Sequence, residues 1–392
     1  MDVSKINAQM DEYLAKGELA GAALVIRRRG EVILRNNWGY ADIQQKKKVE
    51  FNTLFRLASL TKPVTAVGVL KLIDQGKIGL DDELASFLPD FSDMQVVSDR
   101  RYASLAAVKN PFTLLTFRLS NVKTMPAERP VTIRDLLTHS SGLEMGIVGL
   151  LLMLRMKYKD DDLASRAARY ARQPLDFQPG TATGYSPLAG FDVLARVIEV
   201  VSGQPFADYM RHELFEPLGM PDTTFRPDAE QQLRIPRLYK TVHGQHKDVT
   251  GSRADINAIG RIGMAYTSGS AGLYSTLDDY DRFGQMLANQ GELDGVRLLS
   301  PDIVRKINTE TAYQHLETDP GRVWGLGMLV RQDREKTGTR VTPDTYGWSG
   351  AFGTHFFISP RDGLEVVLMM NRSDIGGAAS PIAKRLEELV FE

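Results

Sequence analysis

The sequence contains no cysteine. This absence excludes disulfide bonds, cysteine nucleophiles and zinc sites built on thiolates, and it is typical of proteins from a reducing compartment. The N-terminus, Met-Asp-Val-Ser-Lys-Ile-Asn, also lacks a basic segment followed by an apolar one, so no signal peptide is expected. Together these two absences predict a cytoplasmic location.

Long apolar runs and an excess of one charge are missing as well. The longest apolar stretch, residues 146–154, is far shorter than the ~20 residues that span a bilayer, so a buried helix is expected there and no membrane span. The net charge of -1 gives no reason to expect nucleic acid or an anionic membrane as a partner. The nearest pair of histidines, His243 and His246, lies in a polar loop, so no metal and no other cofactor is expected. The expected partner is a small molecule.

The order of predicted elements indicates the fold class. Strand-like runs occur early, at residues 21–27 and 31–38, and late, at residues 324–331, 346–358 and 365–371, with mostly helical patterns between them. This layout predicts an α+β fold in which both chain ends build one antiparallel sheet flanked by helices. The predicted divisions are a sheet unit of residues 1–79 and 262–392, an inserted, mostly helical unit of residues 80–225, and a surface excursion of residues 226–261 near the active-site cleft.

One stretch combines a possible nucleophile with a possible base. Ser59 follows the extended run Phe55-Arg-Leu-Ala, and an amphipathic helix with apolar residues at three-residue steps follows it. Serine is favoured at a helix N-terminus, and Lys62, three residues on, shares a helix face with Ser59. A serine hydroxyl needs an adjacent base to act as a nucleophile, and a lysine serves as that base where burial or a helix dipole lowers its pKa. The stretch therefore favours nucleophilic catalysis by Ser59.

The same residues have a plainer interpretation, which is a capping serine followed by a surface lysine. Ser-x-x-Lys is a loose pattern, and it recurs at Ser120-Asn-Val-Lys123. No apolar helix follows that second copy, so a loop is expected there. The catalytic interpretation of Ser59 therefore depends on partners elsewhere in the chain.

Two other segments carry candidate partners. Tyr185 lies in a turn-rich loop before an apolar helix, where a phenol near a lysine can exchange protons, although a packed aromatic is the simpler interpretation. Residues 346–354 are rich in glycine and start a predicted strand, which indicates a bulge or the close approach of a ligand or another backbone. A backbone N–H from this strand, together with that of Ser59, would form an oxyanion hole. His355 lies roughly 13 Å along the strand from Ala351, so it is not expected to act as a base on Ser59.

Taken together, these segments resemble the serine β-lactamase-like superfamily. This group includes class C β-lactamases, D-alanyl-D-alanine carboxypeptidases and, most similar to this chain, the family VIII carboxylesterases. The resemblance extends over nearly the whole chain and implies the β-lactamase/transpeptidase-like fold. The stretches that support it are Leu57-Ala-Ser-Leu-Thr-Lys-Pro63, Arg134-Asp-Leu-Leu-Thr-His-Ser-Ser-Gly-Leu143, Phe215-Glu-Pro-Leu-Gly-Met220, Gly272-Leu-Tyr-Ser-Thr276 and Gly295-Val-Arg-Leu-Leu-Ser-Pro301.

The resemblance implies a role for each candidate residue. Ser59 matches the acylated nucleophile and Lys62 its proton partner. Tyr185 matches the first residue of the family's Tyr-x-Asn motif and would be the second acid–base group. The backbone N–H groups of Ser59 and Ala351 would form the oxyanion hole.

Two positions depart from the family's pattern. Pro187 stands where the tyrosine motif has asparagine, and Trp348-Ser349-Gly350 stands where the family has Lys-Thr-Gly. In β-lactamases that lysine helps to recognise a substrate carboxylate, whereas tryptophan supplies apolar surface and no cation. The change favours neutral esters over β-lactams and is similar to the tryptophan variant of family VIII esterases. Trp348, Ser349 and Gly350 are predicted to bind substrate.

The sequence therefore predicts a serine hydrolase that cleaves carboxylic esters through an acyl-enzyme. The alternatives are a β-lactamase, a D-amino-acid peptidase or an acyltransferase on the same scaffold and, from another class, a non-catalytic binding protein. A further hypothesis is that the apolar helix near residues 146–154 and the loop of residues 226–260 shape the pocket for the acyl chain. The sequence does not indicate whether the protein is a monomer or an oligomer.

Overall fold

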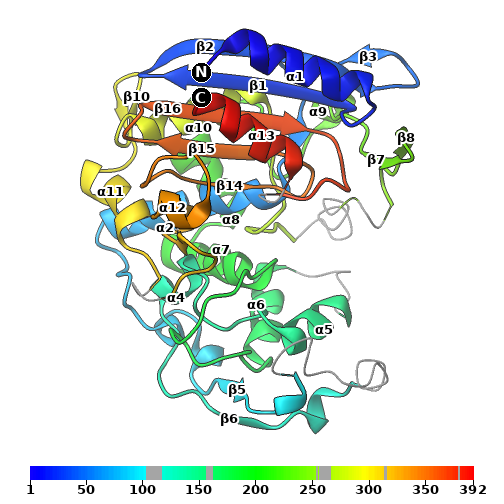
Figure 1. Ribbon diagram of the computed structural model, residues 1–392. Coiled ribbons are helices and arrows are strands. Elements are labelled where there is room, and N and C mark those ends of the chain that lie inside the picture. Colours follow the sequence, from blue (N-terminus) through cyan, green and yellow to red (C-terminus); the bar gives the residue numbers. More distant parts are fainter. Residues whose placement is uncertain (103–116, 156–161, 253–254, 256–265, 313–315, 378–379) are drawn as a thin grey trace.

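A computed structural model describes residues 1–102, 117–155, 162–252, 255, 266–312, 316–377 and 380–392. Its main feature is an antiparallel sheet of eight strands, built from both ends of the chain (Figure 1). The strands, in spatial order, are β12 (Arg322–Trp324), β13 (Leu329–Arg331), β14 (Tyr346–Ser349), β15 (His355–Ser359), β16 (Leu364–Met370), β1 (Gly21–Arg28), β2 (Glu31–Asp42) and β3 (Lys47–Lys48).

Helices cover both faces of this sheet because its central strands are apolar on both faces. On β1, Ala22, Leu24 and Ile26 face one apolar cluster, while Ala23 and Val25 face another. The first cluster is closed by α1 (Val3–Ala15) and α13 (Pro381–Val390), which lie together with both termini on the outer face (Figure 1). The second cluster is closed by α2 (Thr61–Asp74) and α10 (Leu277–Ala288).

Further helices and short hairpins complete the described part of the chain. The lower part of Figure 1 holds α4 (Ile133–Leu137), α5 (Ile147–Arg155), α6 (Leu163–Ala171) and α7 (Ala189–Ser202). The remaining helices are α8 (Phe206–Met210), the π-helix Arg211–Phe215, α9 (Ala229–Leu233), α11 (Pro301–Thr309) and α12 (Arg334–Thr337). The short strand pairs are β4 (Phe55–Arg56) with β9 (Tyr274–Ser275), β5 (Gln95–Val97) with β6 (Thr124–Pro126), β7 (Tyr239–Val242) with β8 (Gln245–Asp248), and β10 (Glu292–Leu293) with β11 (Val296–Arg297).

Two strands predicted as continuous are each broken into two. Residues 324–331 comprise the last residue of β12, a tight turn at residues 325–328 and β13. In the turn, Gly327 has a φ of 82°, a conformation that favours glycine. Residues 346–358 likewise form β14, a turn and β15. The prediction of single strands was wrong because the apolar pattern continues through both turns and conceals them.

The helix after Ser59 also differs from the prediction. It was predicted to be amphipathic, but every residue from Thr61 to Leu70 is buried, so α2 is a central helix of the core. Its N-cap is Leu60, without a side-chain hydrogen bond, and Ser59 belongs to the 3-10 turn Ala58–Leu60 before it. Ser59 therefore does not cap the helix, and its hydroxyl is available for other contacts.

The described part of residues 226–261 is more ordered than the predicted surface excursion. It contains α9 and the β7–β8 hairpin, and Leu238 packs against Ala58 beside the Ser59 turn. Residues 253–254 and 256–261 of this segment lie outside the described residues. The division into a sheet unit and a helical unit stays a prediction, since one apolar cluster runs from Val25 of the sheet through Val67 of α2 to Val193 of α7.

None of the helices in the described ranges is long and apolar enough to cross a bilayer. The apolar stretch at residues 146–154 forms α5, whose Val148 is buried while Leu150 is 41% exposed. The prediction of a helix is confirmed, but its burial is only partial.

Candidate active site

The chain places Ser59 on a strained turn between β4 and α2. Ala58, directly before it, is buried and has a φ of 47°, in the left-handed region that non-glycine residues rarely occupy. Such a residue costs about 1–3 kcal/mol and persists only where its surroundings hold it in place. Strain of this kind often occurs at functional sites, and here it lies next to the predicted nucleophile.

The structure brings Ser59, Lys62 and Tyr185 together. The Tyr185 hydroxyl lies 2.6 Å from Ser59 Oγ, and Lys62 Nζ lies 3.3 Å from the same atom. Ser59 and Tyr185 are partly exposed, so a substrate can reach them, whereas Lys62 is fully buried. The interpretation of Lys62 as a surface lysine is therefore wrong.

Two backbone carbonyls fix the direction of the Lys62 amine. Nζ donates to Pro187 O at 2.8 Å and to Ser270 O at 3.0 Å. A tetrahedral nitrogen with two bonds to carbonyls turns its remaining position towards Ser59 Oγ. That position carries a proton in the ammonium form and a lone pair in the amine, so it is where a proton can be received and returned.

His139 holds the loop of Tyr185 in place. Its backbone carbonyl accepts from the N–H of Gly184, and its ring Nδ1 accepts from the N–H of Ser186. The ring also packs against Tyr185, with ring centroids 5.1 Å apart. Burial and the nearby charge of Lys62 lower the pKa of His139 well below its usual value, so the ring is neutral and can accept this bond. The only available signal was its place in the run Leu-Leu-Thr-His-Ser-Ser-Gly.

The side chain of Glu144 binds the backbone directly after the Tyr185 loop. It is buried, and Oε2 accepts from the N–H of Ala189, at the start of α7 directly after the Tyr185 loop. Burial raises the pKa of Glu144 to about 7. A distant carboxyl thus caps α7, a contact that no local sequence pattern indicates.

We expect Glu144 to make stability depend on pH. Because its pKa is higher in the folded chain than its usual 4.5, its contribution is complete below about pH 4.5 and is lost as the pH rises to about 7. In the wild-type chain the free energy of unfolding should fall by about 3 kcal/mol across this range because Glu144 ionises. Glutamine resembles the protonated acid, so Glu144→Gln should abolish this decrease. Urea unfolding at about pH 5 and about pH 8 measures this difference.

The matched control for this substitution is Glu128→Gln, at an exposed position. It should shift the unfolding free energy equally at both pH values. A Glu144→Gln variant that also shifts both values equally would contradict the assignment of the titration to Glu144.

The turn between β14 and β15 lies against the Ser59 turn. A Cβ on Gly350 would lie 2.1 Å from Leu57 O, and Thr354 Oγ1 donates to the same oxygen at 3.1 Å. Gly350 is therefore needed for the close approach of two backbones, one of the predicted reasons for glycine here. Among described residues, neither Ser59 nor Ala351 donates its backbone N–H to a partner, as an oxyanion hole requires.

Trp348 and Ser349 point to opposite faces of β14, as neighbouring strand residues do. Trp348 is partly exposed and packs against Tyr185, with ring centroids 5.1 Å apart. Ser349 is buried, and its Oγ lies 2.7 Å from Nδ1 of His355, whose Nε2 lies 3.1 Å from Glu387 on α13. The Ser349 hydroxyl is therefore engaged with His355 under α13, and Ser349 stays a predicted substrate-binding residue.

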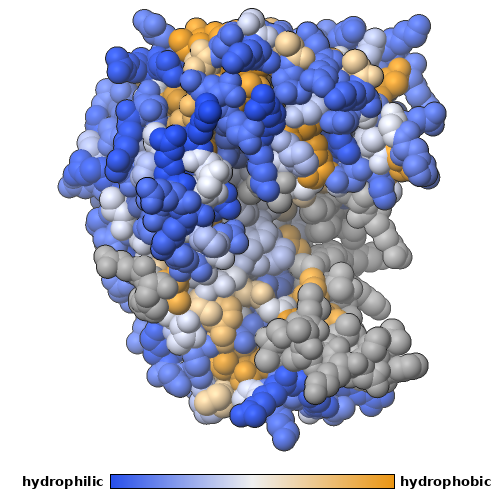
Figure 2. All heavy atoms as spheres, in the orientation of Figure 1, coloured by the Kyte–Doolittle hydropathy of each residue, from blue (hydrophilic) through white to orange (hydrophobic). Residues whose placement is uncertain are grey.

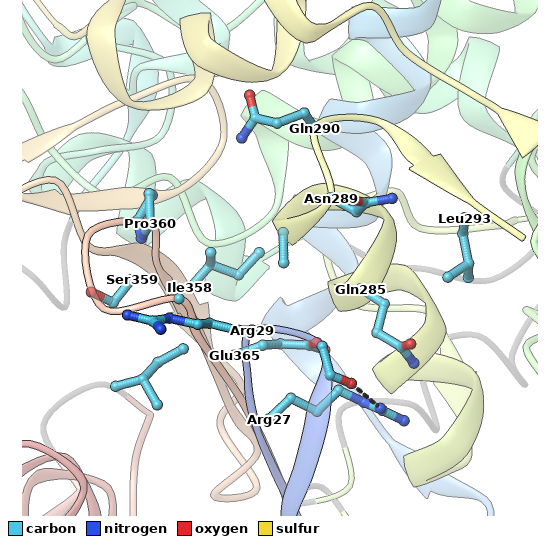
Figure 3. A pocket seen from close by; sticks show the side chains of 14 residues that line it. Arg27, Arg29, Gln285, Asn289, Gln290, Leu293, Ile358, Ser359, Pro360 and Glu365 are labelled. Carbon is cyan, nitrogen blue, oxygen red and sulfur yellow. Dashed lines mark hydrogen bonds between the residues drawn. The ribbon is translucent and has the colours of Figure 1, made fainter. Parts of the chain in front are cut away.

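Figure 3 shows a separate cavity, whose lining does not include Ser59. It has a volume of about 470 Å³ and includes Ser359, at the far end of β15. The Ser359 hydroxyl donates to Asp362, with no lysine or histidine bonded to it in the described structure. Glu365 also lines the cavity, and burial raises its pKa well above its usual value. This cavity is therefore not the candidate active site.

The described residues contain no group of three or more His, Cys, Asp or Glu side chains that could hold a metal ion. His243 and His246 lie on the β7–β8 hairpin, at and beside its turn.

The chain is similar to several known proteins in sequence and in fold. A family model described as Beta-lactamase matches residues 6–389. Protein Rv1367c of Mycobacterium tuberculosis H37Rv is 30% identical over 386 residues, covering 94% of this chain and 90% of that protein. Esterase EstB of Burkholderia gladioli is 29% identical over 411 residues, covering 99% and 95%. The solved structure of EstCE1, "a hydrolase with promiscuous acyltransferase activity", is 23% identical, has a TM-score of 0.80 and covers 100% of this chain and 98% of its own.

Proposed function

The chain belongs to the beta-lactamase family and is a serine hydrolase with that family's fold, and from this premise we propose that it hydrolyses carboxylic esters through an acyl-enzyme on Ser59. The observation that carries the proposal is the pair of contacts to Ser59 Oγ, one from Tyr185 at 2.6 Å and one from Lys62 at 3.3 Å. A non-catalytic binding protein has no need of this arrangement. EstB, which aligns with nearly the whole chain, is named an esterase.

Acylation begins when Ser59 Oγ attacks the ester carbonyl carbon. The hydroxyl proton passes to the coupled Tyr185 and Lys62 pair, and the carbonyl oxygen becomes an oxyanion held by the N–H groups of Ser59 and Ala351. The bond to the alcohol oxygen then breaks, and the alcohol leaves with the proton that the pair returns.

Deacylation repeats these steps with water. Water gives a proton to the Tyr185 and Lys62 pair, attacks the acyl carbon and releases the acid as Ser59 regains its proton. An alcohol that takes the place of water forms a new ester, so the same site supports acyl transfer.

Trp348 favours esters over β-lactams. It packs against Tyr185 at the position where β-lactamases carry the lysine of Lys-Thr-Gly. A ring here supplies apolar surface beside the scissile bond and no cation for a carboxylate at that point. The proposed substrates are therefore esters without a charge next to the reacting carbonyl.

The test compares substrates and identifies the modified residue. We expect kcat/KM for p-nitrophenyl butyrate to exceed that for a chromogenic cephalosporin and for a D-alanyl-D-alanine peptide by at least about 10²-fold. A fluorophosphonate probe should label Ser59, as read from peptide masses, and leave Ser120 unlabelled. Faster turnover of the cephalosporin or the peptide would favour a β-lactamase or a peptidase instead. An unlabelled Ser59 without turnover would favour a binding protein.

A further inference from the structure

A cavity of about 630 Å³ adjoins the proposed active site at Trp324 and Trp348. Both rings lie against Tyr185, with centroids 5.9 and 5.1 Å from its ring. Thr318, which also lines the cavity, has its Oγ1 3.3 Å from that of Thr183 in the Tyr185 loop. These contacts place the end of the cavity formed by Trp324 and Trp348 beside the proposed active site.

The cavity lies where the sheet opens. β13 pairs with Tyr346 and Gly347 of β14 but not with Trp348. The lining comes from β12, β13, α12, the residues after α12, and α13. The surface over α12 and α13 is hydrophilic in Figure 2.

Cationic side chains are more numerous in the lining than acidic ones. The cations are Arg322, Arg331, Lys336, Arg340 and Lys384. Against these five cations stand three acids in the lining, Asp319, Glu387 and Glu388. The cavity therefore carries a positive excess.

The acids form salt bridges, whereas two of the five cations form none within the described ranges. Glu387 pairs with Arg331, and Glu388 pairs with Arg385 outside the cavity at 2.8 Å. Within the described ranges, the side chains of Arg340 and Lys384 make neither a hydrogen bond nor an ion pair. These two cations are free to bind an anion.

Two tryptophan rings line the end of the cavity next to Tyr185. The indole N–H groups of Trp324 and Trp348 have no acceptor among the described residues, and Trp324 is only 1% exposed. Both N–H groups are shielded from solvent, so the two indoles offer the cavity apolar ring surface next to Tyr185.

We propose that this cavity binds an anionic group of the substrate, a carboxylate or a similar oxyanion, separated from the scissile ester by an apolar spacer. The spacer lies along Trp348, and the anion reaches Lys384 and Arg340. This inference rests on the proposed esterase function and narrows its substrate class to esters that are neutral at the reacting carbonyl and anionic at a distance. A β-lactamase places its cation at position 348, whereas this chain places cations beyond it.

The test uses pairs of p-nitrophenyl esters that differ only at the far end of the acyl chain. Monoesters of adipic, suberic and sebacic acid carry a carboxylate where the hexanoate, octanoate and decanoate esters carry a methyl group. The wild-type chain should show a lower KM for the anionic member at one or more chain lengths, and this preference should weaken as salt is added. Acetoxybenzoate and phenyl acetate form a second pair, with the anion on the leaving group.

The variant is Lys384→Glu, and its matched control is Lys77→Glu, an exposed lysine outside the cavity. Lys384→Glu should raise KM for the preferred anionic ester about five- to tenfold and leave the neutral ester unchanged. The control should change neither value. A preference for the anionic ester in the acyl series would place the acyl chain in the cavity. The same preference in the leaving-group series would place the alcohol part there.

The inference is overturned if no anionic ester is preferred in either series, or if both variants behave alike. Hydrolysis of neutral esters distinguishes failure of this inference from failure of the proposed esterase function. Hydrolysis of neutral esters that depends on Ser59 would leave the proposed function intact, and its absence would remove both.

Discussion

Ser59→Ala is expected to lower kcat for p-nitrophenyl butyrate by at least about 10⁴-fold, because no other hydroxyl takes the place of the nucleophile. The hydroxyl is the one atom to which both Tyr185 and Lys62 are directed. Its loss leaves the proposed oxyanion hole and the proposed proton-transfer pair without a nucleophile. Steady-state hydrolysis, with active-site titration of the wild-type chain, measures the effect.

The matched control is Ser120→Ala, in the second Ser-x-x-Lys sequence. Ser120 and Lys123 are exposed, and Ser120 lies in a 3-10 turn without a following helix, as the sequence predicted. This variant should keep full activity. Thermal unfolding of both variants excludes a loss caused by misfolding, and equal activity in Ser59→Ala and the wild-type chain would disprove the acyl-enzyme on Ser59.

The sequence alone indicated the fold and the central part of the site. The two early strand runs, at residues 21–27 and 31–38, were predicted and correspond to β1 and β2, because their strand-like patterns are uninterrupted. Ser59 was distinguishable from Ser120 by the apolar helix that follows it. Family resemblance then added Tyr185 as a partner from a distant loop, and the structure places it beside Ser59.

Other features depend on contacts that no local pattern records. The burial of Lys62 follows from two carbonyls far along the chain, at Pro187 and Ser270. The direction of the Ser349 hydroxyl follows from His355 and α13, which the motif Trp348-Ser349-Gly350 does not indicate. Tertiary packing, and not propensity, decided both.

One omission was avoidable. The helix α10 was not predicted, although Thr276 caps it and Leu277, Tyr280, Phe283 and Leu287 recur at helical spacing. The family motif Gly272–Thr276 ends directly before this helix, and the helical period begins at Leu277. The missed helix packs on the inner face of the sheet, with Tyr280 donating to Leu60 O beside the Ser59 turn.

Lys62→Met is expected to lower kcat by about 10²–10⁴-fold with little change in KM. Methionine fills a similar volume but cannot carry a proton between Ser59 and Tyr185. It also leaves Pro187 O and Ser270 O without the donor they share, which costs about 1–3 kcal/mol for each buried acceptor. Stability is therefore measured beside activity, by urea unfolding of each variant.

The matched control is Lys71→Met on the same helix. Lys71 Nζ donates to Glu213 O at 2.8 Å on the far side of α2, so this variant also loses a lysine contact from α2 but does not touch Ser59. It should be destabilised and remain active. If Lys71→Met lost activity in proportion to its stability, the effect of Lys62→Met would have to be structural.

Tyr185→Phe completes a double-mutant cycle that tests whether the two groups act as one unit. If Lys62 and Tyr185 move the same proton, the double variant should lose little more than the more damaging single variant. Losses that multiply would mean that the groups act in separate steps. The geometry favours the first result, because both groups contact one oxygen and Lys62 Nζ lies 4.9 Å from the centre of the Tyr185 ring. A proton taken from Ser59 is therefore within reach of both groups at once, and removing either group breaks the same path.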